Sequence, residues 1–279
     1  MPKLAIFDLD GTIATHGVVA PTVLEGLKHL RQAGCITTLS TGRGYVRLKQ
    51  LLGDVFEEVI SPDALIILEH GTKLVDRAGT TIFGEFLSAD EIDHVIDFVR
   101  ANIELFRIAW FNPADVSRKI SVWCPDEQEV DEEIEKRGSY AEVFTGSLEE
   151  LKQALLREQL TSVTFKLRDH IQVHNLKLSF TRTETNVIFQ DGNMEFLRNN
   201  INKGLAVLEA AHKLDVAKDD LLLAGNAIND VEMLDLDVGR SLLIDAAGKN
   251  SPILQYLSSP ENVTVLSSPD ALGTYLQQL

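Results

Sequence analysis

The sequence predicts an α/β fold in which both ends of the chain form one doubly wound parallel sheet and the middle of the chain forms an inserted α+β domain. Near both ends, short apolar segments alternate with amphipathic segments of 10 to 15 residues. This alternation is typical of β-α-β units, whose right-handed crossovers produce parallel strands. Turn residues and polar side chains follow several of the apolar segments. Between about residues 84 and 190 the order of helices and strands changes.

The first 70 residues contain three expected strands. Residues 3–9 form a short apolar segment that ends in an acidic turn, and residues 21–33 follow with apolar side chains at intervals of three and four, as in a helix. Gly34 stands where a helix often ends. Residues 35–39 and 64–68 are apolar or β-branched and predict the second and third strands.

Two further features complete this first part of the chain. The turn residues 40–43 precede a second helical segment that continues to Leu52. Gly71 and Gly79 then indicate a hairpin after the third strand.

The middle of the chain is interpreted as an inserted α+β domain covering residues 85–189, with residues 1–84 and 190–279 forming the core domain. Residues 89–103 and 149–160 have helical periodicity, and the acidic segment 126–135 is interpreted as a solvated helix face. The expected strands of this domain are residues 108–110, 119–123, 162–167 and 171–174.

The pattern of the core domain returns after Gly204. A helix is expected over residues 205–212, a strand over residues 221–224, and the start of another helix over residues 231–234. The core sheet is therefore expected to contain strands from both ends of the chain.

Composition excludes several functional classes. The 279 residues include 42 Asp and Glu against 26 Lys and Arg, a net charge of −16, which argues against nucleic-acid binding. No apolar run approaches the roughly 18 residues of a membrane helix, and the N-terminus does not resemble a signal peptide. Cys35 and Cys124 are far apart in the sequence, which argues against a disulfide scaffold and favours the reducing cytoplasm.

The first expected strand ends in Asp8-Leu9-Asp10-Gly11-Thr12. Residues two apart on an extended chain point the same way, so both carboxylates can face one ligand at the strand end, where open α/β sheets bind ligands. Oxygen ligands of this kind suit Mg²⁺, and a carboxylate beside a phosphoryl group can attack phosphorus. An Asp-rich turn without chemistry is the alternative.

Three other segments carry polar side chains to the same edge. Thr41 and Gly42 follow the second strand, where a hydroxyl and backbone N–H groups can hold a phosphate oxygen, although a simple helix cap explains them equally well. Lys203 opens a helix, where its ammonium group can neutralise a phosphoryl group and the nucleophilic carboxylate, and an ordinary surface lysine is the alternative. Residues 225–230 follow the strand at 221–224 and provide further oxygen ligands. The agreement of these segments favours a phosphoryl-transfer site.

These motifs resemble those of the haloacid dehalogenase superfamily, and more closely its Cof-type sugar-phosphate phosphatases with an inserted type II cap. The resemblance covers essentially the whole chain. It rests on four motifs: Asp8-Leu9-Asp10-Gly11-Thr12, Ser40-Thr41-Gly42-Arg43, Asn202-Lys203-Gly204, and the segment from Gly225 to Leu234. It implies a Rossmann-like core, with the cap inserted between the second and third motifs.

The resemblance implies a role for each matching residue. Asp8 attacks phosphorus and binds Mg²⁺, while Asp10 lends its carbonyl to the metal and its carboxyl group as acid and then base. Asn226 and Asp230 complete or support the Mg²⁺ site. The residues implied to bind the phosphorylated substrate are Thr41, Gly42, Arg43, Lys203 and Asn229.

The sequence departs from the family pattern at two places. Asn226 stands where the family carries an aspartate that usually binds Mg²⁺, so weaker metal binding is expected because an amide oxygen has no net charge. Glu69-His70-Gly71 stands where the subfamily often has Asn-Gly.

The favoured interpretation is a cytoplasmic, Mg²⁺-dependent phosphatase acting on a small phosphorylated metabolite, such as a sugar phosphate, as a monomer or weak homodimer. A dehalogenase is disfavoured because it does not need Asp10, and a P-type ATPase because Leu9 replaces its lysine. A phosphomutase of the same fold remains an alternative, as does a binding module that has lost turnover through Asn226.

Overall fold

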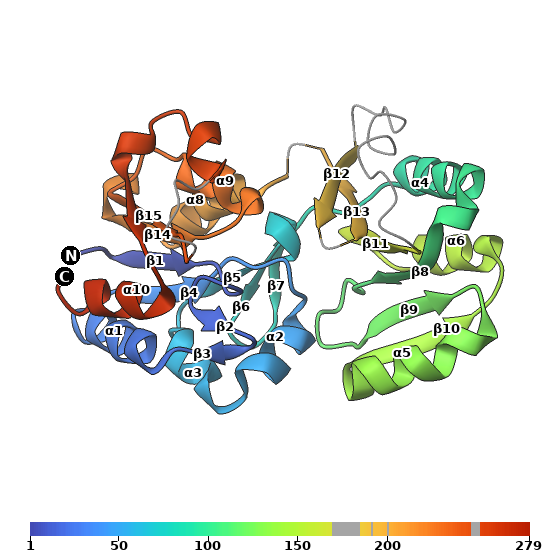
Figure 1. Cartoon of the computed structure of the whole chain (residues 1–279), viewed down its shortest axis with the longest axis horizontal. Helices are drawn as coiled ribbons and strands as arrows, with labels where there is room; N and C mark the ends of the chain where they lie inside the picture. Colours follow the sequence, from blue (N-terminus) through green and yellow to red (C-terminus); the bar gives the residue numbers. More distant parts are fainter. Residues whose placement is uncertain (169–184, 191, 200, 247–251) are drawn as a thin grey trace. The chain divides into compact units, whose positions relative to one another are not determined.

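A computed structural model of the chain describes residues 1–168, 185–190, 192–199, 201–246 and 252–279. The chain divides into two compact units. Unit 1 comprises Met1–Phe83 and Asn202–Leu279, and unit 2 comprises Gly84–Ile201. Both chain ends lie in unit 1 (Figure 1). Each unit has its own sheet and hydrophobic core.

Unit 1 is built on a five-stranded parallel sheet with the order β16-β15-β14-β1-β4. Strands from both ends of the chain therefore pair with each other, as the sequence predicts. The chain runs from β1 outward to β4 on one side and returns at β14 on the other, so the strand order reverses between β1 and β14. Ligands of open α/β sheets bind at such a reversal. The strands are β1 (Leu4–Phe7), β4 (Ile36–Leu39), β14 (Leu221–Gly225), β15 (Arg240–Ile244) and β16 (Val263–Leu266).

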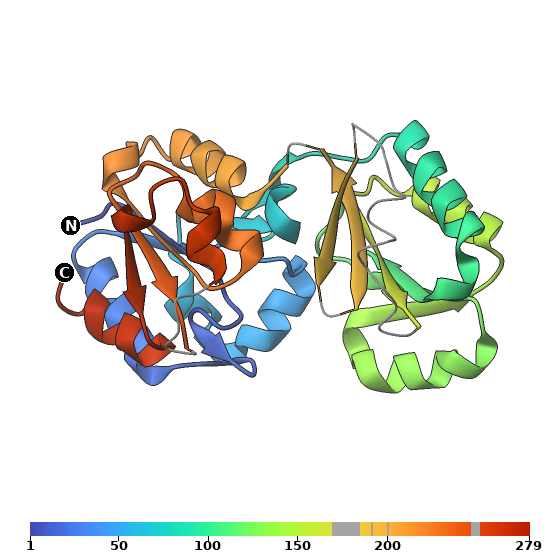
Figure 2. The same cartoon turned by 45° about the horizontal axis from the view of Figure 1, so that its top comes forward.

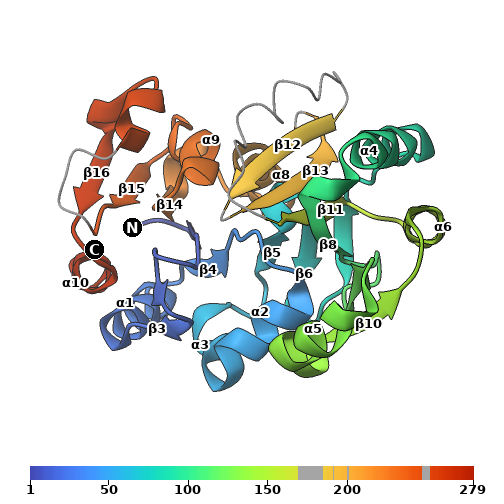
Figure 3. The same ribbon diagram turned by 45° about the vertical axis from the view of Figure 1, so that its right-hand side comes forward.

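Helices cover both faces of this sheet. Figures 1 and 3 show α1 and α10 on one side, and α8 and α9 on the other. Helix α1 begins at Pro21, buries Val23, Leu27 and Leu30 at helical spacing, and is followed by Gly34 with a φ of 87°. The helices of unit 1 are α1 (Pro21–Gln32), α2 (Tyr45–Leu52), α3 (Phe56–Val59), α8 (Lys203–Lys213), α9 (Val231–Leu234) and α10 (Pro269–Leu276).

The third predicted strand, β5 (Leu65–Leu68), lies in a separate small sheet with the order β5-β6-β7. It pairs antiparallel with β6 (Lys73–Asp76), and β7 (Thr81–Gly84) follows the turn at Gly79, as the hairpin prediction requires. A single parallel bridge between Ser40 and Ile67 joins β5 to the segment after β4. The end of β5 is thereby placed beside the end of β4. The remaining hairpin of unit 1 is β2 (Ala14–Thr15) and β3 (Val18–Val19).

Unit 2 contains a six-stranded mixed sheet with the order β10-β9-β8-β11-β13-β12. Only β9 and β10 are parallel among the pairs described, and helix α5 connects them. Predicted strands 108–110, 119–123 and 162–167 are present, whereas predicted strand 171–174 lies outside the described residues. The strands are β8 (Phe106–Phe111), β9 (Ile120–Cys124), β10 (Ala141–Thr145), β11 (Ser162–Leu167), β12 (Thr185–Gln190) and β13 (Asn193–Arg198).

Helices α4 (Ala89–Ala101) and α6 (Leu148–Arg157) contribute to the main core of unit 2 together with one face of its sheet. Both begin with a capping box, in which Ser88 pairs with Glu91 and Ser147 with Glu150. The other face carries a smaller apolar cluster, which includes Val130 at the start of α5 (Val130–Arg137). Figure 2 shows α5 running along β10.

The acidic segment 126–135 forms a short 3-10 helix and most of α5, and its side chains are mostly exposed. Glu133 is the exception. Its side chain is fully buried and accepts a hydrogen bond from Arg137 at 2.7 Å. The prediction of a solvated helix face is therefore wrong for this one residue, because an arginine one turn later neutralises it.

No helix within the described ranges has both the length and the apolar character needed to cross a bilayer. The remaining short elements are 3-10 helices at Gly53–Val55, Glu69–Gly71, Ile103–Leu105, Glu127–Glu129, Gly138–Tyr140, Lys218–Asp220, Ile228–Asp230, Pro252–Tyr256 and Pro260–Asn262.

Candidate functional site

The ends of β1 and β14 bring Asp8 and Asn226 together. The two strands pair in register up to Phe7 and Ala224, and the Asp8 N–H donates to the Ala224 carbonyl at 2.8 Å. Because the strands are parallel, the residues that follow them emerge at the same edge of the sheet. This edge is also where the strand order reverses.

Lys203 connects two carboxylates inside the protein. Its ammonium group lies 2.6 Å from Asp8 Oδ1 and 2.6 Å from Asp230 Oδ1, and its side chain is only 1% exposed. Lys203 is the first residue of α8, whose preceding Asn202 caps the helix by accepting from the Leu205 N–H. A lysine at this position would be an ordinary surface residue if α8 did not pack its first turn against the sheet edge.

The charges at this cluster depend on each other. Burial raises the pKa of Asp8 to about 6, the Asp230 charge adds to this increase, and Lys203 opposes it. Burial alone would lower the pKa of Lys203, but the charges and hydrogen bonds of Asp8 and Asp230 raise it above its ordinary value. The lysine is therefore ionised, and it balances one of the two carboxylates.

Asp230 shapes the loop after β14. Its Oδ2 accepts from the backbone N–H groups of Asn226 and Ala227, both at 2.9 Å, while its Oδ1 binds Lys203. Gly225 permits this arrangement, because an added Cβ would lie 2.6 Å from the Asp230 side chain. Both oxygens of Asp230 thus bind protein donors, Oδ1 the Lys203 ammonium group and Oδ2 the two loop N–H groups.

The Asn226 carboxamide lies among oxygen atoms of the first motif. One end of it is 3.1 Å from the Asp10 carbonyl oxygen, 3.3 Å from Asp8 Oδ2 and 3.3 Å from Thr12 Oγ1. Gly11, with a φ of 88°, makes this approach possible, because a Cβ there would lie 2.2 Å from the carboxamide.

These oxygens are a donor set that suits Mg²⁺. The Asp8 carboxylate and the Asp10 carbonyl offer hard oxygen ligands on either side of the Asn226 carboxamide. Hydrogen bonding favours the nitrogen end of that carboxamide toward them, and a half-turn of the carboxamide would present its oxygen to a metal instead. The set fits the metal that the motifs imply, although one anionic ligand is replaced by a neutral one. Within the described residues no three His, Cys, Asp or Glu side chains gather as a metal site.

Asp10 and Arg43 form a bidentate pair. Arg43 Nε and one terminal nitrogen donate to the Asp10 oxygens at 2.7 and 2.9 Å. Both side chains are partly open to solvent, with Asp10 48% exposed and Arg43 32% exposed. The Asp10 carboxylate therefore faces outward while its carbonyl faces Asn226, so the two aspartates of the motif present different groups to the buried cluster.

Thr41 and Gly42 form the loop after β4. Thr41 is buried, its N–H donates to the Ile67 carbonyl, and its Oγ1 accepts from the Arg43 N–H at 3.2 Å. Gly42 packs against His70, which is not part of the four motifs. The contact is close, because a Cβ added to Gly42 would lie 2.5 Å from the His70 ring.

The turn Glu69–Gly71 is the part of the site that sequence reasoning did not assign. His70 Nδ1 lies 3.4 Å from the Asn229 carboxamide nitrogen, and its backbone N–H donates to the Thr41 carbonyl at 3.3 Å. The sequence carried a signal for this placement, because the turn directly follows the strand at 65–68 and departs from the subfamily pattern.

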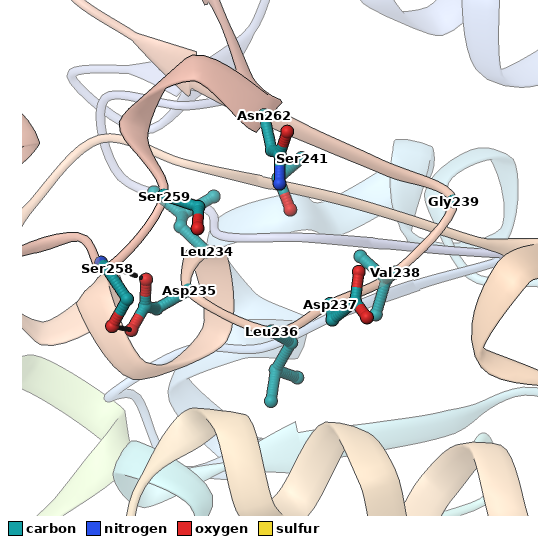
Figure 4. A pocket seen from close by; sticks show the side chains of 10 residues that line it. All are labelled: Leu234, Asp235, Leu236, Asp237, Val238, Gly239, Ser241, Ser258, Ser259 and Asn262. Atoms are coloured by element: carbon teal, nitrogen blue, oxygen red, sulfur yellow. Dashed lines mark hydrogen bonds between the residues drawn. The ribbon is translucent and has the colours of Figure 1, made fainter.

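A separate pocket lies at the opposite edge of the sheet, at the amino end of β15 (Figure 4). It has a volume of about 630 Å³ and is lined by polar residues such as Asp235, Asp237 and Ser241. Asp235 accepts from the Ser258 hydroxyl at 2.7 Å. None of the predicted site residues lines this pocket.

The chain resembles known proteins over most of its length. It is 29% identical over 259 residues to an HMP-PP phosphatase of Yersinia pseudotuberculosis serotype O:1b (strain IP 31758), covering 88% of this chain and 85% of that protein. In fold it is similar to TM0651 from Thermotoga maritima, with a TM-score of 0.76, 15% identity, and coverage of 100% and 98% of the two chains. It is also similar to BT4131, described as a HAD subclass IIB sugar phosphatase, with a TM-score of 0.73, 15% identity, and coverage of 99% and 98%.

The structural similarities establish the fold, and the predicted α/β class is confirmed. The phosphatase names of these relatives agree with the expectation of an enzyme that hydrolyses phosphoric monoesters. A family model described as haloacid dehalogenase-like hydrolase matches residues 5–250, which include all four motifs. The chain therefore belongs to the haloacid dehalogenase-like hydrolases.

Proposed function

We propose that this chain is a Mg²⁺-dependent phosphatase that hydrolyses a small phosphorylated metabolite through an aspartyl-phosphate at Asp8. The observation that carries the proposal is the buried bridge in which Lys203 lies 2.6 Å from both Asp8 and Asp230. An anionic nucleophile and an anionic substrate repel each other unless a cation lies between them. A fully buried ammonium group beside a strand-end carboxylate meets this need.

In the first step, one Asp8 oxygen attacks phosphorus and the bond between phosphorus and the leaving oxygen breaks. Lys203, the Thr41 hydroxyl and the Gly42 N–H stabilise the charge that develops on the phosphoryl oxygens, and Asn229 donates to one of them. Once released from Arg43, Asp10 carries a proton taken from solvent or kept from the hydrolysis step of the preceding turnover, and it gives this proton to the leaving oxygen, which departs as the alcohol. The products of this step are the alcohol and phosphorylated Asp8.

Asp10 must leave Arg43 before it can reach the leaving oxygen. Their ion pair is partly exposed, and exposed pairs typically contribute about 1 kcal/mol or less. Arg43 can therefore exchange Asp10 for an anionic group of the substrate at little cost. The pair would hold Asp10 near the site until the substrate enters.

In the second step, Asp10 removes a proton from water, and the water oxygen attacks phosphorus. The bond between phosphorus and Asp8 breaks, which releases inorganic phosphate and restores the Asp8 carboxylate. Asp10 thus acts first as an acid and then as a base.

Asp8, the Asp10 carbonyl and Asn226 would hold Mg²⁺, which would neutralise negative charge on the phosphoryl group. The neutral Asn226 contributes an oxygen but no charge to this set. We therefore infer that metal binding is weaker here than it would be with a carboxylate at position 226.

The names of the relatives support two candidate substrate classes. One solved neighbour is described as a sugar phosphatase, and curated relatives at 29% identity are named HMP-PP phosphatase. We propose a sugar phosphate as the first candidate and HMP-PP as the second. We also propose that unit 1 is the catalytic core and that unit 2 is the inserted cap, whose residues select the leaving group.

The buried thiols support a cytoplasmic location. Cys35 and Cys124 are both free, and burial raises their pKa values to about 12 and about 11. Such thiols are inert and form no disulfide, as is usual in a reducing compartment.

A binding module without turnover is the second candidate, because Asn226 removes one negative charge from the metal site. It would keep the buried Lys203 bridge and bind phosphate without cleaving an ester.

The test is phosphate release from a panel of hexose, pentose and nucleotide monophosphates and HMP-PP at saturating Mg²⁺. The proposal expects release from at least one compound, with loss of release in Asp8→Asn. Binding of inorganic phosphate without any release, by folded protein, would instead support the binding module. Release that persists in Asp8→Asn would exclude Asp8 as the nucleophile.

A further inference from the structure

The turn Glu69–Gly71 contacts all three segments that the proposed mechanism assigns to the phosphoryl group. The His70 ring packs against Gly42, where an added Cβ would lie 2.5 Å from it. An added Cβ at Gly71 would lie 2.4 Å from the carbonyl oxygen of Asn202, the residue before Lys203. His70 Nδ1 lies 3.4 Å from the carboxamide nitrogen of Asn229. The turn is therefore packed against all three segments.

The backbone of this turn is held in an unfavourable conformation. Glu69, His70 and Gly71 have consecutive positive φ angles of 50°, 58° and 100°. For residues with a side chain this conformation costs on the order of 1 kcal/mol each. Strain of this kind persists only where surrounding contacts hold it, and it often accompanies function.

Buried contacts hold the turn in place. Glu69 and Lys73 form an ion pair of 3.2 Å in which both side chains are at most 1% exposed. The Thr72 hydroxyl donates to the Glu69 carbonyl at 2.9 Å. These contacts fix the backbone on both sides of His70, so the imidazole cannot easily leave Asn229.

Asn229 is otherwise poorly held. Its Oδ1 is buried and has no hydrogen-bond partner among the described residues, whereas its nitrogen faces His70. A carboxamide can turn about its terminal bond and exchange its donor and acceptor ends. Only the donor end can bind a phosphoryl oxygen. The contact with His70 is therefore the one that decides which end faces the phosphoryl group.

We propose that His70 is a positioning residue that holds Asn229 with its amide nitrogen ready to bind the phosphoryl group. In this arrangement, Nδ1 of a neutral imidazole accepts one amide hydrogen, and the second hydrogen is left for a phosphoryl oxygen. In this tautomer, turning the amide would place its oxygen against the Nδ1 lone pair, which disfavours the reverse orientation. The proposal rests on the phosphatase function, because it assigns Asn229 to the phosphoryl group.

This role predicts an effect on every substrate alike. The contact between His70 and Asn229 concerns the phosphoryl group, which all phosphate esters share, and not the leaving group. Loss of the contact should raise KM for different esters by a similar factor. A residue that recognises the leaving group would instead change the order of substrate preference.

The first experiment is a double-mutant cycle on the full chain, with kcat and KM measured for two unrelated phosphate esters. His70→Ala should lower kcat/KM about tenfold, the size expected for one lost hydrogen bond to a charged ligand. His70→Asn should stay within about threefold of the parent, because asparagine tolerates a positive φ and its Oδ1 can accept from Asn229. In the Asn229→Ala background, His70→Ala should have less than about a twofold further effect.

Equal effects of His70→Ala with and without Asn229 would overturn the proposal, because the histidine would then act independently of the carboxamide. His16→Ala is the matched control for backbone strain. His16 also has a positive φ, 51°, but its side chain is exposed. Its variant reports on the stability cost of placing alanine in this conformation.

A second measurement separates this proposal from the proposed function. Nitrogen NMR of histidine labelled with ¹⁵N reports which ring nitrogen carries the proton, and His70→Asn assigns the signal. The proposal expects an unprotonated Nδ1 in His70 whose resonance shifts in Asn229→Ala. A protonated Nδ1, or no shift in Asn229→Ala, would overturn it, whether or not the chain releases phosphate.

Discussion

Two opposite effects act on the Asp8 carboxylate. Burial favours its protonated form, while Lys203 at 2.6 Å favours the ionised form, and burial is the larger effect because the pKa rises to about 6. Asp230 adds a second negative charge to the same cluster. Without a bound metal, the cluster therefore carries more negative charge than Lys203 balances.

The first prediction follows from the raised pKa of Asp8. Its ordinary pKa is 3.8, so the native state binds this proton more tightly than the unfolded state, and stability is lost as pH rises from about 4 through about 6. In Asp8→Asn this loss is absent. The variant should be more stable than the parent at pH 8 by on the order of 1–3 kcal/mol, and the difference should vanish near pH 4. Urea unfolding in EDTA at the two pH values measures it.

The control for this prediction is Mg²⁺. The metal should stabilise the parent more than Asp8→Asn, because the variant has lost a charged ligand. A parent that is more stable than the variant at pH 8 in EDTA would show that the Lys203 ion pair outweighs the cost of burial.

The second prediction concerns Asn226. Its carboxamide lies 3.1–3.3 Å from three oxygens of the first motif, which is where a cation would sit. Asn226→Asp adds a negative charge there and should lower the Mg²⁺ concentration for half-maximal phosphate release about tenfold, which corresponds to about 1.4 kcal/mol. Asn262→Asp, on an exposed residue at the opposite edge of the sheet, is the matched control for added charge. If both variants keep the parent's requirement, position 226 is not a ligand.

At the scale of elements, the sequence predicts well where strands end, because the residues that mark a strand end are its neighbours in the sequence. A short apolar strand followed by glycine and polar residues identifies the loops after β1, β4 and β14. The parallel sheet then brings these loops to one edge, so Asp8, Asn226 and Thr41 are found where they are expected. The burial of Lys203 could not be predicted in this way, because a lysine at the start of a helix is more often an exposed surface residue and only the packing of α8 at this edge buries it.

Other elements are harder to predict, since they depend on contacts between distant residues. The strand at 65–68 has the apolar pattern of a sheet interior, but it pairs with β6 in a separate sheet, and the single bridge between Ser40 and Ile67 links it to the segment after β4. That same bridge brings His70 to the site. The buried state of Glu133 depends on the Arg137 side chain one turn later, which an acidic run does not reveal.

The third prediction concerns the contact between α1 and α10. An added Cβ at Gly273 would lie 2.3 Å from a backbone atom of Thr22, so the two helices would have to separate. Gly273→Ala should lower the free energy of unfolding by on the order of 2 kcal/mol, although alanine favours helix by about 1 kcal/mol. Thermal unfolding measures this loss. Gly34→Ala is the comparison without a steric clash. Gly34 has a φ of 87°, which strains an alanine, but no atom lies within 4 Å of an added Cβ. A stabilised Gly273→Ala variant would mean that the helices can move apart freely.

At the scale of the whole molecule, the net charge of −16 opposes the approach of an anionic substrate. The buried Lys203 acts only at short range, and Arg43 is already paired with Asp10. Long-range repulsion between substrate and protein is screened by salt, with a Debye length of about 10 Å at 0.1 M.

The fourth prediction is therefore that salt accelerates substrate capture. At saturating Mg²⁺, kcat/KM for a phosphate ester should rise severalfold between about 10 mM and about 150 mM KCl, while kcat changes little. Steady-state kinetics at constant pH measures both values. A kcat/KM that falls with salt would instead show that the site attracts anions from a distance.

The central claim is that Asp8 carries the phosphoryl group, and chemical trapping of this intermediate tests it most directly. Borohydride added during turnover reduces an aspartyl-phosphate to homoserine, and mass spectrometry of the peptide that contains residues 8 and 10 locates the change. The account predicts homoserine at position 8, only in the presence of substrate and Mg²⁺. Reduction at position 10, or turnover without any trapped residue at position 8, would contradict it.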